Sequence, residues 1–395
     1  MSARGKIVRL AKPLERAIAD GHPWVYRAAL RGEPTLPAGT VLDVHDRRDR
    51  FLARGLAETG PIALRVFGLT RLSIDRALFD RRLATALELR HLLAVPETTA
   101  IRWVHGEGDR LPGLVCDRYG DVVIVAFDGE AIAAHRESAI AAVIDLAGHH
   151  GVRAVAVKRG RGAQKQLETV VGDIAPGPFP VRERGMVMLV DVHLGQKTGL
   201  FLDHRDSRAW VRARARGRSV LNLYGYTGGF SIAAGLGGAR RVTTVDQSAP
   251  ALELAQASWG LNGLAADSHQ TVAGDVREFL DATGSGGDAQ YDLVVCDPPS
   301  FAPNQRSREA ALTAYRQLHG AAIGRVTPGG LLLAASCSAH VDRSAFEDTL
   351  RAGARQAKRH LQVLGRWGAG ADHPVPLGFP EGNYLKVTLC RATAR

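Results

Sequence analysis

The sequence predicts an α/β protein with a C-terminal doubly wound, Rossmann-like domain that follows a small β-barrel and a small α/β domain. The chain has 395 residues, which is too long for one hydrophobic core. From about residue 186, short apolar runs alternate with helical patterns, as in a mostly parallel sheet with helices on both faces. The first part of the chain instead has short apolar runs separated by charged residues or glycine, which favours strands.

Three domains are expected, and they comprise residues 1–72, 73–180 and 181–395. The second boundary follows a flexible basic loop, KRGRGAQK (158–165), and a segment rich in proline and glycine, APGPFPV (175–181). Such segments are typical of connections between domains.

The first domain has three candidate strands, VLDVHD (41–46), FLARGLA (51–57) and IALRVFG (62–68). Before them, GHPWVY (21–26) places an aromatic pair next to basic residues, which suits an RNA-binding barrel. For Trp24 itself we favour the simpler interpretation that its ring fills the core of the barrel.

The second domain is expected to be a small α/β unit. Its elements are a leucine-rich helix over 73–93, the strand VVIVAF (122–127), an alanine-rich helix over 131–147 and the strand VRAVAVK (152–158). The third domain is expected to contain five parallel strands, VLNLYG (220–225), RVTTVD (241–246), HQTVAGD (269–275), YDLVVCD (291–297) and LLLAASC (331–337). A late pair of runs, LQVLGRW (361–367) and YLKVTLC (384–390), can close this sheet in antiparallel fashion.

The chain carries a formal net charge of +11, which favours a polyanionic partner such as nucleic acid. A general bias toward arginine gives the same charge without such a role. Neither an apolar run of about 20 residues nor a secretory signal is recognisable, so we expect a cytoplasmic protein without a membrane span. The 4 cysteines form no C-x-x-C pair, which argues against a zinc site and suits a reducing compartment.

In an open α/β sheet, ligands bind beyond the carboxyl ends of the strands. The first such end, LNLYGYTGGF (221–230), contains Gly225, Gly228 and Gly229, which allow a tight turn and a close approach of a ligand to the backbone. The helix that follows directs its amide groups toward that ligand. The spacing is not G-x-G-x-x-G, so a dinucleotide is not specifically indicated.

Acidic residues follow the next two strands. The carboxylate of Asp246 can accept hydrogen bonds from both hydroxyls of a ribose, although it can equally cap the helix that begins near Ser248. Its combination with the glycine turn favours adenosine. Asp275 can face the adenine amino group, and the alternative is an ordinary turn aspartate.

The fourth strand ends in CDPPSF (296–301), where two prolines stiffen a loop and remove backbone donors. Asp297 and nearby carbonyl groups are left as acceptors, which can hold a flipped-out base by its exocyclic amino group. Phe301 can stack on that base. The alternative is a purely structural turn.

The fifth strand ends in AASCS (334–338), and Cys337 is expected to face the same cleft. Its thiolate can act as a nucleophile. Burial in the core is the more usual fate of cysteine, and we assign that role to Cys116, Cys296 and Cys390.

Taken together, these residues resemble the large-subunit ribosomal RNA cytosine-C5 methyltransferases that carry an N-terminal PUA domain. The resemblance covers nearly the whole chain. It rests on GHPWVY, GEGDRLPGLVCDRYG (106–120), VDVHLGQKTGLFLDHRDSR (190–208), LNLYGYTGGF, CDPPSF, AASCS and HPVPLGFPEGNYLK (373–386). One departure is Ser300, which stands where many members have lysine.

The resemblance implies S-adenosylmethionine (SAM) as the methyl donor and a cytosine of 23S rRNA, free or in a pre-ribosomal particle, as the acceptor. It implies Cys337 and Asp297 as the catalytic residues. The expected cofactor-binding residues are Asn222, Tyr224, Gly225, Thr227, Gly228, Gly229, Phe230, Asp246, Gln247, Ser248, Asp275, Val276, Asp297 and Pro298. The expected substrate contacts are Pro299, Ser300, Phe301, Lys197, Arg205 and Trp24.

For two of these residues another role is equally open. Lys197 and Arg205 lie in QKTGLFLDHRDSR (196–208) and can contact phosphates or the cofactor's carboxylate, or can belong to a salt-bridged structural linker. In the expected reaction the Cys337 thiolate adds to C6 of cytosine, C5 attacks the methyl group, and a base that the sequence does not identify removes the C5 proton.

Other functions are compatible with parts of this pattern. A SAM-dependent enzyme that methylates a base nitrogen also uses a D-P-P loop, but needs no thiol. A non-catalytic RNA-binding or ribosome-assembly factor needs only the basic N-terminal module. An NAD-dependent dehydrogenase shares the glycine turn, but leaves CDPPSF and AASCS unexplained. A homodimer also remains open.

Overall fold

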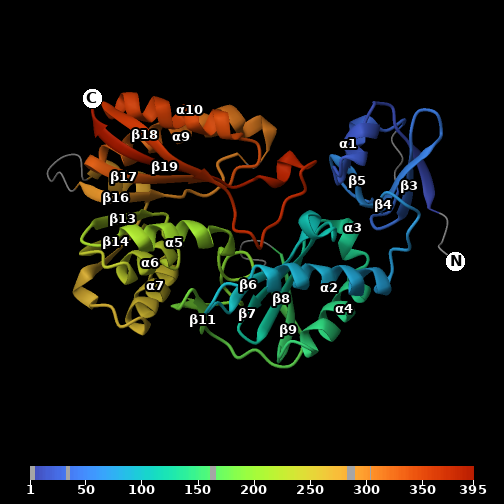
Figure 1. Ribbon diagram of the computed structural model, residues 1–395, viewed down its shortest axis with the longest axis horizontal. Helices are drawn as coiled ribbons and strands as arrows, with labels where there is room; N and C mark the ends of the chain where they lie inside the picture. Colours follow the sequence, from blue (N-terminus) through green and yellow to red (C-terminus); the bar gives the residue numbers. More distant parts are fainter. Residues whose placement is uncertain (1–4, 33–35, 161–165, 283–289, 303) are drawn as a thin grey trace.

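The computed structural model describes residues 5–32, 36–160, 166–282, 290–302 and 304–395 (Figure 1). Its strands form four sheets, which follow one another along the chain. Residues 161–165 of the predicted basic loop lie outside the described residues. Within the described part, no helix is long and apolar enough to span a bilayer.

The N-terminal sheet has the strand order β1-β3-β4-β5-β2. Its strands are β1 (Lys6–Arg9), β2 (Trp24–Tyr26), β3 (Val41–His45), β4 (Phe51–Ala57) and β5 (Ile62–Gly68), with the short helix α1 (Glu15–Ala19) between β1 and β2. β1 runs parallel to β3, and the other neighbours are antiparallel. The three strands predicted here are confirmed, and most of their buried apolar residues pack in one cluster, with Leu56 and Phe67 packed in the cluster of the second domain.

The second sheet has the order β10-β9-β8-β7-β6. Its strands are β6 (Ala100–His105), β7 (Leu114–Tyr119), β8 (Val122–Phe127), β9 (Ala154–Arg159) and β10 (Gln166–Val171). The helices α2 (Arg76–Leu92), α3 (Glu130–Ala133) and α4 (Arg136–Gly148) accompany it. α4 connects β8 to β9, which are parallel, as the predicted α/β unit requires.

The predicted alanine-rich helix over 131–147 is broken in two between α3 and α4. His135 lies at the break, and its Nε2 is 2.8 Å from the carbonyl oxygen of Gly39 in the first domain. A Cβ atom on Gly39 would lie 2.3 Å from the Cβ of Ala134, so only glycine permits this approach. The contact with the first domain therefore interrupts the helix.

A hairpin of β11 (Phe179–Glu183) and β12 (Met186–Val190) crosses the expected boundary at residue 180. Met188 and Val190 pack in one buried cluster with Tyr119 of the second sheet and Ile232 of the third domain. The two domains thus share apolar packing, and the boundaries proposed from the sequence stay predictions.

The largest sheet has the order β15-β14-β13-β16-β17-β19-β18. Its strands are β13 (Ser219–Leu223), β14 (Arg241–Asp246), β15 (His269–Ala273), β16 (Tyr291–Cys296), β17 (Val326–Ser336), β18 (Arg359–Trp367) and β19 (Lys386–Ala394). The strands β13 to β17 pair with one another in parallel, and β19 pairs antiparallel with both β17 and β18. The predicted parallel sheet and its antiparallel closing pair are confirmed.

Helices cover both faces of this sheet (Figure 1). α8 (Val276–Ala282), α9 (Arg308–Gly324) and α10 (Arg343–Gln356) bury their apolar residues against one face. α5 (Arg205–Arg214), α6 (Gly229–Leu236) and α7 (Ala249–Leu261) cover the other. The neighbours Val294 and Val295 of β16 belong to opposite clusters, as the two-residue period of a strand requires.

The segment between β18 and β19, residues 368–385, reaches back to the earlier domains (Figure 1). Asp372 accepts hydrogen bonds from Arg205 and from the backbone N–H of Arg102, and Phe379 packs against Trp24. Short 3₁₀ helices complete the fold: η1 (Arg27–Ala29), η2 (Gly106–Asp109), η4 (Leu202–His204), η5 (Ala266–Ser268), η6 (Gln305–Ser307) and η7 (Pro380–Gly382).

Candidate active site

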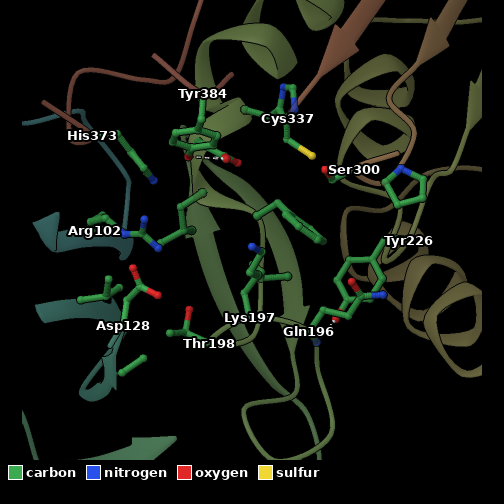
Figure 2. Close-up of a pocket in the computed structure, with 18 of the residues that line it drawn as sticks. Arg102, Asp128, Gln196, Lys197, Thr198, Tyr226, Ser300, Cys337, His373 and Tyr384 are labelled. Atoms are coloured by element: carbon green, nitrogen blue, oxygen red, sulfur yellow. Dashed lines mark hydrogen bonds between the residues drawn. The ribbon is translucent and has the colours of Figure 1, made fainter. Parts of the chain in front are cut away.

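A cleft of about 1600 Å³ opens at the carboxyl edge of the seven-stranded sheet and continues to the second domain. Residues from the loops after β13, β14, β15, β16 and β17 all line it. Figure 2 shows Cys337, Ser300 and Lys197 directed toward the same space, with Arg102 and Asp128 approaching from the second domain.

Most of the residues predicted from the sequence meet in this cleft. It is lined by Lys197, Tyr224, Gly225, Thr227, Gly229, Phe230, Asp246, Gln247, Asp275, Val276, Asp297, Pro298, Pro299, Ser300, Phe301 and Cys337. The other predicted residues, all of which the structure describes, lie outside its lining: Asn222, Gly228, Ser248, Arg205 and Trp24.

Three residues outside the lining shape the glycine turn from behind. Asn222 is buried and donates through Nδ2 to Oγ of Ser231, at 2.8 Å. Gly228 has a φ of 76°, and a Cβ there would lie 2.6 Å from the Cβ of Ala255. Ser248 caps α7 by accepting from the N–H of Ala251.

Asp246 ties the first two loops together. Its Oδ2 accepts from the backbone N–H of Tyr226 at 2.8 Å, and its Oδ1 accepts from that of Ser248 at 2.9 Å. Gly225 lies in the same turn, where a Cβ would lie 2.3 Å from Cγ2 of Thr244. The result is an acidic group beside an open backbone turn, and this donor and acceptor set fits the adenosine part of SAM.

The next loop carries Asp275, whose Oδ1 accepts from the backbone N–H groups of Arg277 and Glu278 at the start of α8. The carboxyl group therefore caps the helix while it lines the cleft. Asp275 can therefore be a turn aspartate, which was the alternative interpretation, and still contact adenine as expected.

Three cleft residues other than glycine have left-handed backbone conformations. The φ angles of Lys197, Tyr224 and Tyr226 are 53°, 57° and 47°. Residues with a Cβ adopt this region at a cost and are kept there by their surroundings. The hydroxyl of Tyr226 accepts from the N–H of Gln196 at 2.7 Å and so joins two of these strained segments.

Asp297 forms an ion pair with a buried histidine. Nε2 of His204 lies 3.0 Å from Oδ2 of Asp297, and the histidine side chain is 4% exposed. Burial opposes the charged ring, but the carboxylates of Asp297 and Asp203 outweigh it and raise the pKa of His204 above its ordinary value. Asp297 thus faces a histidine whose protonated form is favoured by the neighbouring carboxylates.

Cys337 follows β17 and is half-buried in the cleft. Burial raises the pKa of its thiol to about 11, and the nearby carboxylate of Asp297 acts in the same direction. Lys197 and Lys386 oppose this effect. At neutral pH the thiol is therefore protonated in the free protein, and positive charge brought into the cleft favours the thiolate.

Ser300 links the D-P-P loop to the loop after β17. Its Oγ is 3.1 Å from Oγ of Ser338, which in turn lies 3.0 Å from the hydroxyl of Tyr315. Nζ of Lys386 donates to the carbonyl oxygens of Ser338 and Tyr384, and burial lowers the pKa of Lys386 to about 8. Ser300 thus connects two of the loops that line the cleft or lie next to it.

Comparisons with known proteins agree with this geometry. Residues 137–367 match the S-adenosylmethionine-dependent methyltransferase family, and residues 8–68 match the PUA-like domain. The chain is 38% identical to a ribosomal RNA large subunit methyltransferase of Deinococcus radiodurans, over 97% of this chain and 96% of that protein. It is 35% identical to the ribosomal RNA large subunit methyltransferase I of Klebsiella pneumoniae strain 342, over 97% of each. The chain belongs to the ribosomal RNA large subunit methyltransferase I family.

Solved structures share the fold of this methyltransferase. A methyltransferase crystallised with SAH has a TM-score of 0.87 and 25% identity, and the match covers 98% of this chain and 100% of the other. A Streptococcus mutans protein described as SAM-dependent has a TM-score of 0.86 and 24% identity. The methyltransferase depends on SAM, and the predicted family, fold class and cofactor are confirmed.

One predicted substrate contact is contradicted. Arg205 of the methyltransferase is 3% exposed, and its Nη2 donates to Oδ2 of Asp372 and to the carbonyl oxygen of Ala100. A guanidinium that is buried among these partners cannot contact a phosphate in the cleft. The alternative of a salt-bridged structural segment is the correct one for Arg205, whereas Lys197 does line the cleft.

Trp24 is neither in the cleft nor in the core of the first domain. Its Nε1 donates to Oε1 of Glu107 at 2.8 Å, and its ring packs edge to face against Phe379 with centroids 4.6 Å apart. The prediction that its ring fills the core of the first domain is wrong, because the ring joins the domains. The expected substrate contact of Trp24 stays a prediction.

Several cleft residues were missed. The sequence offered no periodic signal for His204 and Tyr384, since both lie in irregular segments that only the fold brings to the cleft. The hydroxyl of Tyr384 donates to Oδ2 of Asp203 at 2.7 Å (Figure 2). Tyr226 was overlooked although it lies within the predicted glycine turn. Cys116, Cys296 and Cys390 are buried, as predicted.

Proposed function

We propose that this methyltransferase forms 5-methylcytosine in large-subunit ribosomal RNA, with Cys337 as the covalent nucleophile. The proposal rests on one observation: Cys337 and Asp297 line the same cleft as Asp246. The thiol and the carboxyl group that would act on the cytosine therefore share one cleft with the carboxyl group that would hold the adenosine of SAM. The names of the relatives support large-subunit rRNA as the substrate. We place the reaction in the cytoplasm, on rRNA that is free or in a pre-ribosomal particle.

The two sides of the cleft have different proposed roles. SAM, when bound, supplies an electrophilic methyl group on a sulfonium. Asp246 holds the ribose hydroxyls and Asp275 faces the adenine amino group. The loop of Pro299, Ser300 and Phe301 contacts the flipped-out cytosine, with Phe301 as the stacking surface. The N-terminal PUA domain binds RNA outside the cleft.

The chemistry requires activation of the base, because C5 of cytosine is a poor nucleophile. The Cys337 thiolate adds to C6, which makes C5 enamine-like, and C5 then takes up the methyl group. Asp297 holds N4 and N3 and stabilises the charge that develops on the ring. Loss of the C5 proton and departure of the thiolate restore aromaticity.

The Cys337→Ala variant tests this function. We expect rRNA methylation to fall at least about 10³-fold, because the covalent step is lost. The product is checked by nucleoside mass analysis of rRNA from a deletion strain, in which one 5-methylcytosine should be missing. SAH affinity measured by calorimetry should change little, since the thiol does not hold the adenosine.

The matched control is Cys390→Ala, which removes a buried thiol of the same sheet away from the cleft. It should retain methylation. If Cys337→Ala instead keeps most of the activity, the acceptor is a base nitrogen and not C5. If the chain binds neither SAM nor SAH, the non-catalytic RNA-binding alternative applies.

A further inference from the structure

The proposed addition step needs a proton as well as a thiolate. When the Cys337 sulfur bonds to C6, electron density moves onto N3 of the cytosine, which becomes basic. An ionised carboxylate only accepts hydrogen bonds. Asp297 can therefore satisfy N3 only if a neighbouring group supplies a proton. This inference rests on the proposed function.

His204 is the group that touches Asp297 from the cleft wall. It ends η4 and lines the cleft, and its Nε2 is 3.0 Å from Oδ2 of Asp297. The side chain is 4% exposed, so water does not compete freely for this contact. The ring is further enclosed by Phe230, whose centroid is 5.3 Å away.

The second ring nitrogen has a partner that suits both charge states. Nδ1 of His204 is 3.3 Å from Oγ of Ser207, and that oxygen also accepts from Nε1 of Trp367 at 2.8 Å. A hydroxyl can donate to Nδ1 of the neutral ring or accept from Nδ1–H of the charged ring. The charged ring directs Nε2–H at Asp297, and a neutral ring that has lost the Nε2 proton can still donate from Nδ1–H to Ser207.

The charged groups around the ring come from three elements. Asp297 follows β16, Asp203 lies on η4, and Arg208 lies on α5. Burial and Arg208 disfavour the imidazolium, but the two carboxylates outweigh them and raise the pKa of His204. Arg208 is itself paired with Glu183. These neighbours therefore favour the protonated ring over the neutral one.

We propose that His204 stores the proton that Asp297 delivers to the cytosine during addition. As the sulfur–C6 bond forms, the C5–C6 π electrons become the C4–C5 double bond and the C4–N3 π electrons move onto N3. The proton on Nε2 of His204 passes to the carboxylate of Asp297 and from Asp297 to N3, so Asp297 ends as a carboxylate. His204 is left neutral, with its remaining proton on Nδ1. After C5 is methylated and deprotonated, the thiolate leaves and N3 returns its proton along the same path. His204 acts through Asp297 and is a positioning residue.

The test isolates the addition step with an RNA that contains 5-fluorocytidine. Fluorine at C5 cannot leave as a proton does, so the covalent adduct accumulates and is counted on a denaturing gel in the presence of SAM. The rate of adduct formation is measured from about pH 5.5 to 9 for the unmodified protein, for His204→Gln and for His360→Gln. His360 is exposed on β18 and is the matched control.

The unmodified protein and His360→Gln should show a break in the logarithmic pH–rate plot. Below the break the rate rises tenfold per pH unit as the thiol ionises. Above the break the slope falls to zero. There the fraction of protonated His204 falls tenfold per pH unit while the fraction of thiolate rises tenfold, so the two effects cancel. His204→Gln still donates to Asp297 but cannot ionise, so its rate is about 10²-fold lower near neutral pH and keeps rising without the break.

A break that persists in His204→Gln overturns the inference and leaves the proposed function intact. A protein that methylates rRNA but forms no adduct overturns the proposed function instead. Should His204→Gln fail to fold, as judged by SAH calorimetry, Ser207→Ala replaces it. That variant removes the acceptor for Nδ1–H, so the break should move to lower pH, and an unmoved break overturns the inference.

Discussion

The charge states of Cys337, His204 and Asp203 follow from their surroundings. Burial raises the pKa of the Cys337 thiol to about 11. Asp203 is also buried, yet His204, His373 and the hydroxyl of Tyr384 lower its pKa to about 2. Burial penalises any charge, and a charge persists only where an opposite one lies close by. Residue type alone therefore does not give the state in which a side chain works.

His319 makes a residue-scale prediction about stability. It is fully buried on α9, and burial lowers its pKa to about 3. The unfolded histidine titrates near 6.5, so the unfolded chain binds more protons between about pH 3 and 6.5, and the free energy of unfolding falls as the pH drops through this window. His319→Gln should reduce this slope by up to about 1.4 kcal/mol per pH unit.

Urea unfolding at pH 7, 6 and 5 measures this effect. The exposed His360→Gln variant should leave the slope unchanged. Equal slopes in His319→Gln and the unmodified protein would show that the histidine is solvated in the folded state.

At the scale of elements, the site depends on irregular segments that are held by buried ion pairs. Arg205 at the start of α5 donates to Asp372 in the segment 368–385, and Arg208 one turn later pairs with Glu183 of β11. These contacts fix η4, which directly precedes α5 and presents Asp203 and His204 to the cleft. The segment of η4 and residues 368–385 have little regular backbone hydrogen bonding, so contacts between side chains hold them in place.

Asp372→Ala tests this role. Removal of the carboxylate leaves the buried guanidinium of Arg205 with the longer 3.8 Å contact from its Nε to Oε2 of Glu183 as its ion pair. Breaking a buried pair costs about 3–5 kcal/mol. Urea unfolding should show that loss. The exposed pair of Arg184 and Asp206 is the comparison, and Asp206→Ala should change stability little. Similar effects of both variants would contradict a structural role for Asp372.

At the scale of the molecule, side-chain contacts join the first domain to the two domains that form the cleft, in addition to the chain connection. Trp24 bonds to Glu107 of the second domain and packs on Phe379 of the third. Glu381, from the same segment as Phe379, accepts from Tyr26 and lies 3.2 Å from Nε2 of His22. These contacts hold the PUA domain at a set position relative to the cleft.

Trp24→Ala should loosen this attachment. The lost aromatic pair and hydrogen bond correspond to roughly 1–2 kcal/mol, and we expect the KM for rRNA to rise about tenfold. SAH affinity should be unchanged, because Trp24 lies outside the cleft lining. Limited proteolysis of the connection at residues 69–75 should become faster. An unchanged KM would show that the orientation of the first domain does not matter for substrate binding.

Much of the fold could be predicted because it depends on local patterns. The alternation in β4 and β5, and the apolar runs of β14 and β16, were located to within a residue of their bounds. The strands β6, β10, β11 and β12 were missed, since they are short or partly polar and gain stability only from their neighbours. The break between α3 and α4 was also missed, because a contact from the first domain causes it.

The sequence by itself determined the loops that meet at the cleft, because parallel strands bring their carboxyl ends to one edge of a sheet. It also determined the cofactor and the family through the order of its motifs. Only the tertiary structure decided that Arg205 is buried in a salt-bridged segment, that Trp24 joins the domains and that His204 pairs with Asp297. Those assignments depend on contacts between residues that are distant along the chain, and neither periodicity nor composition carries information about such contacts.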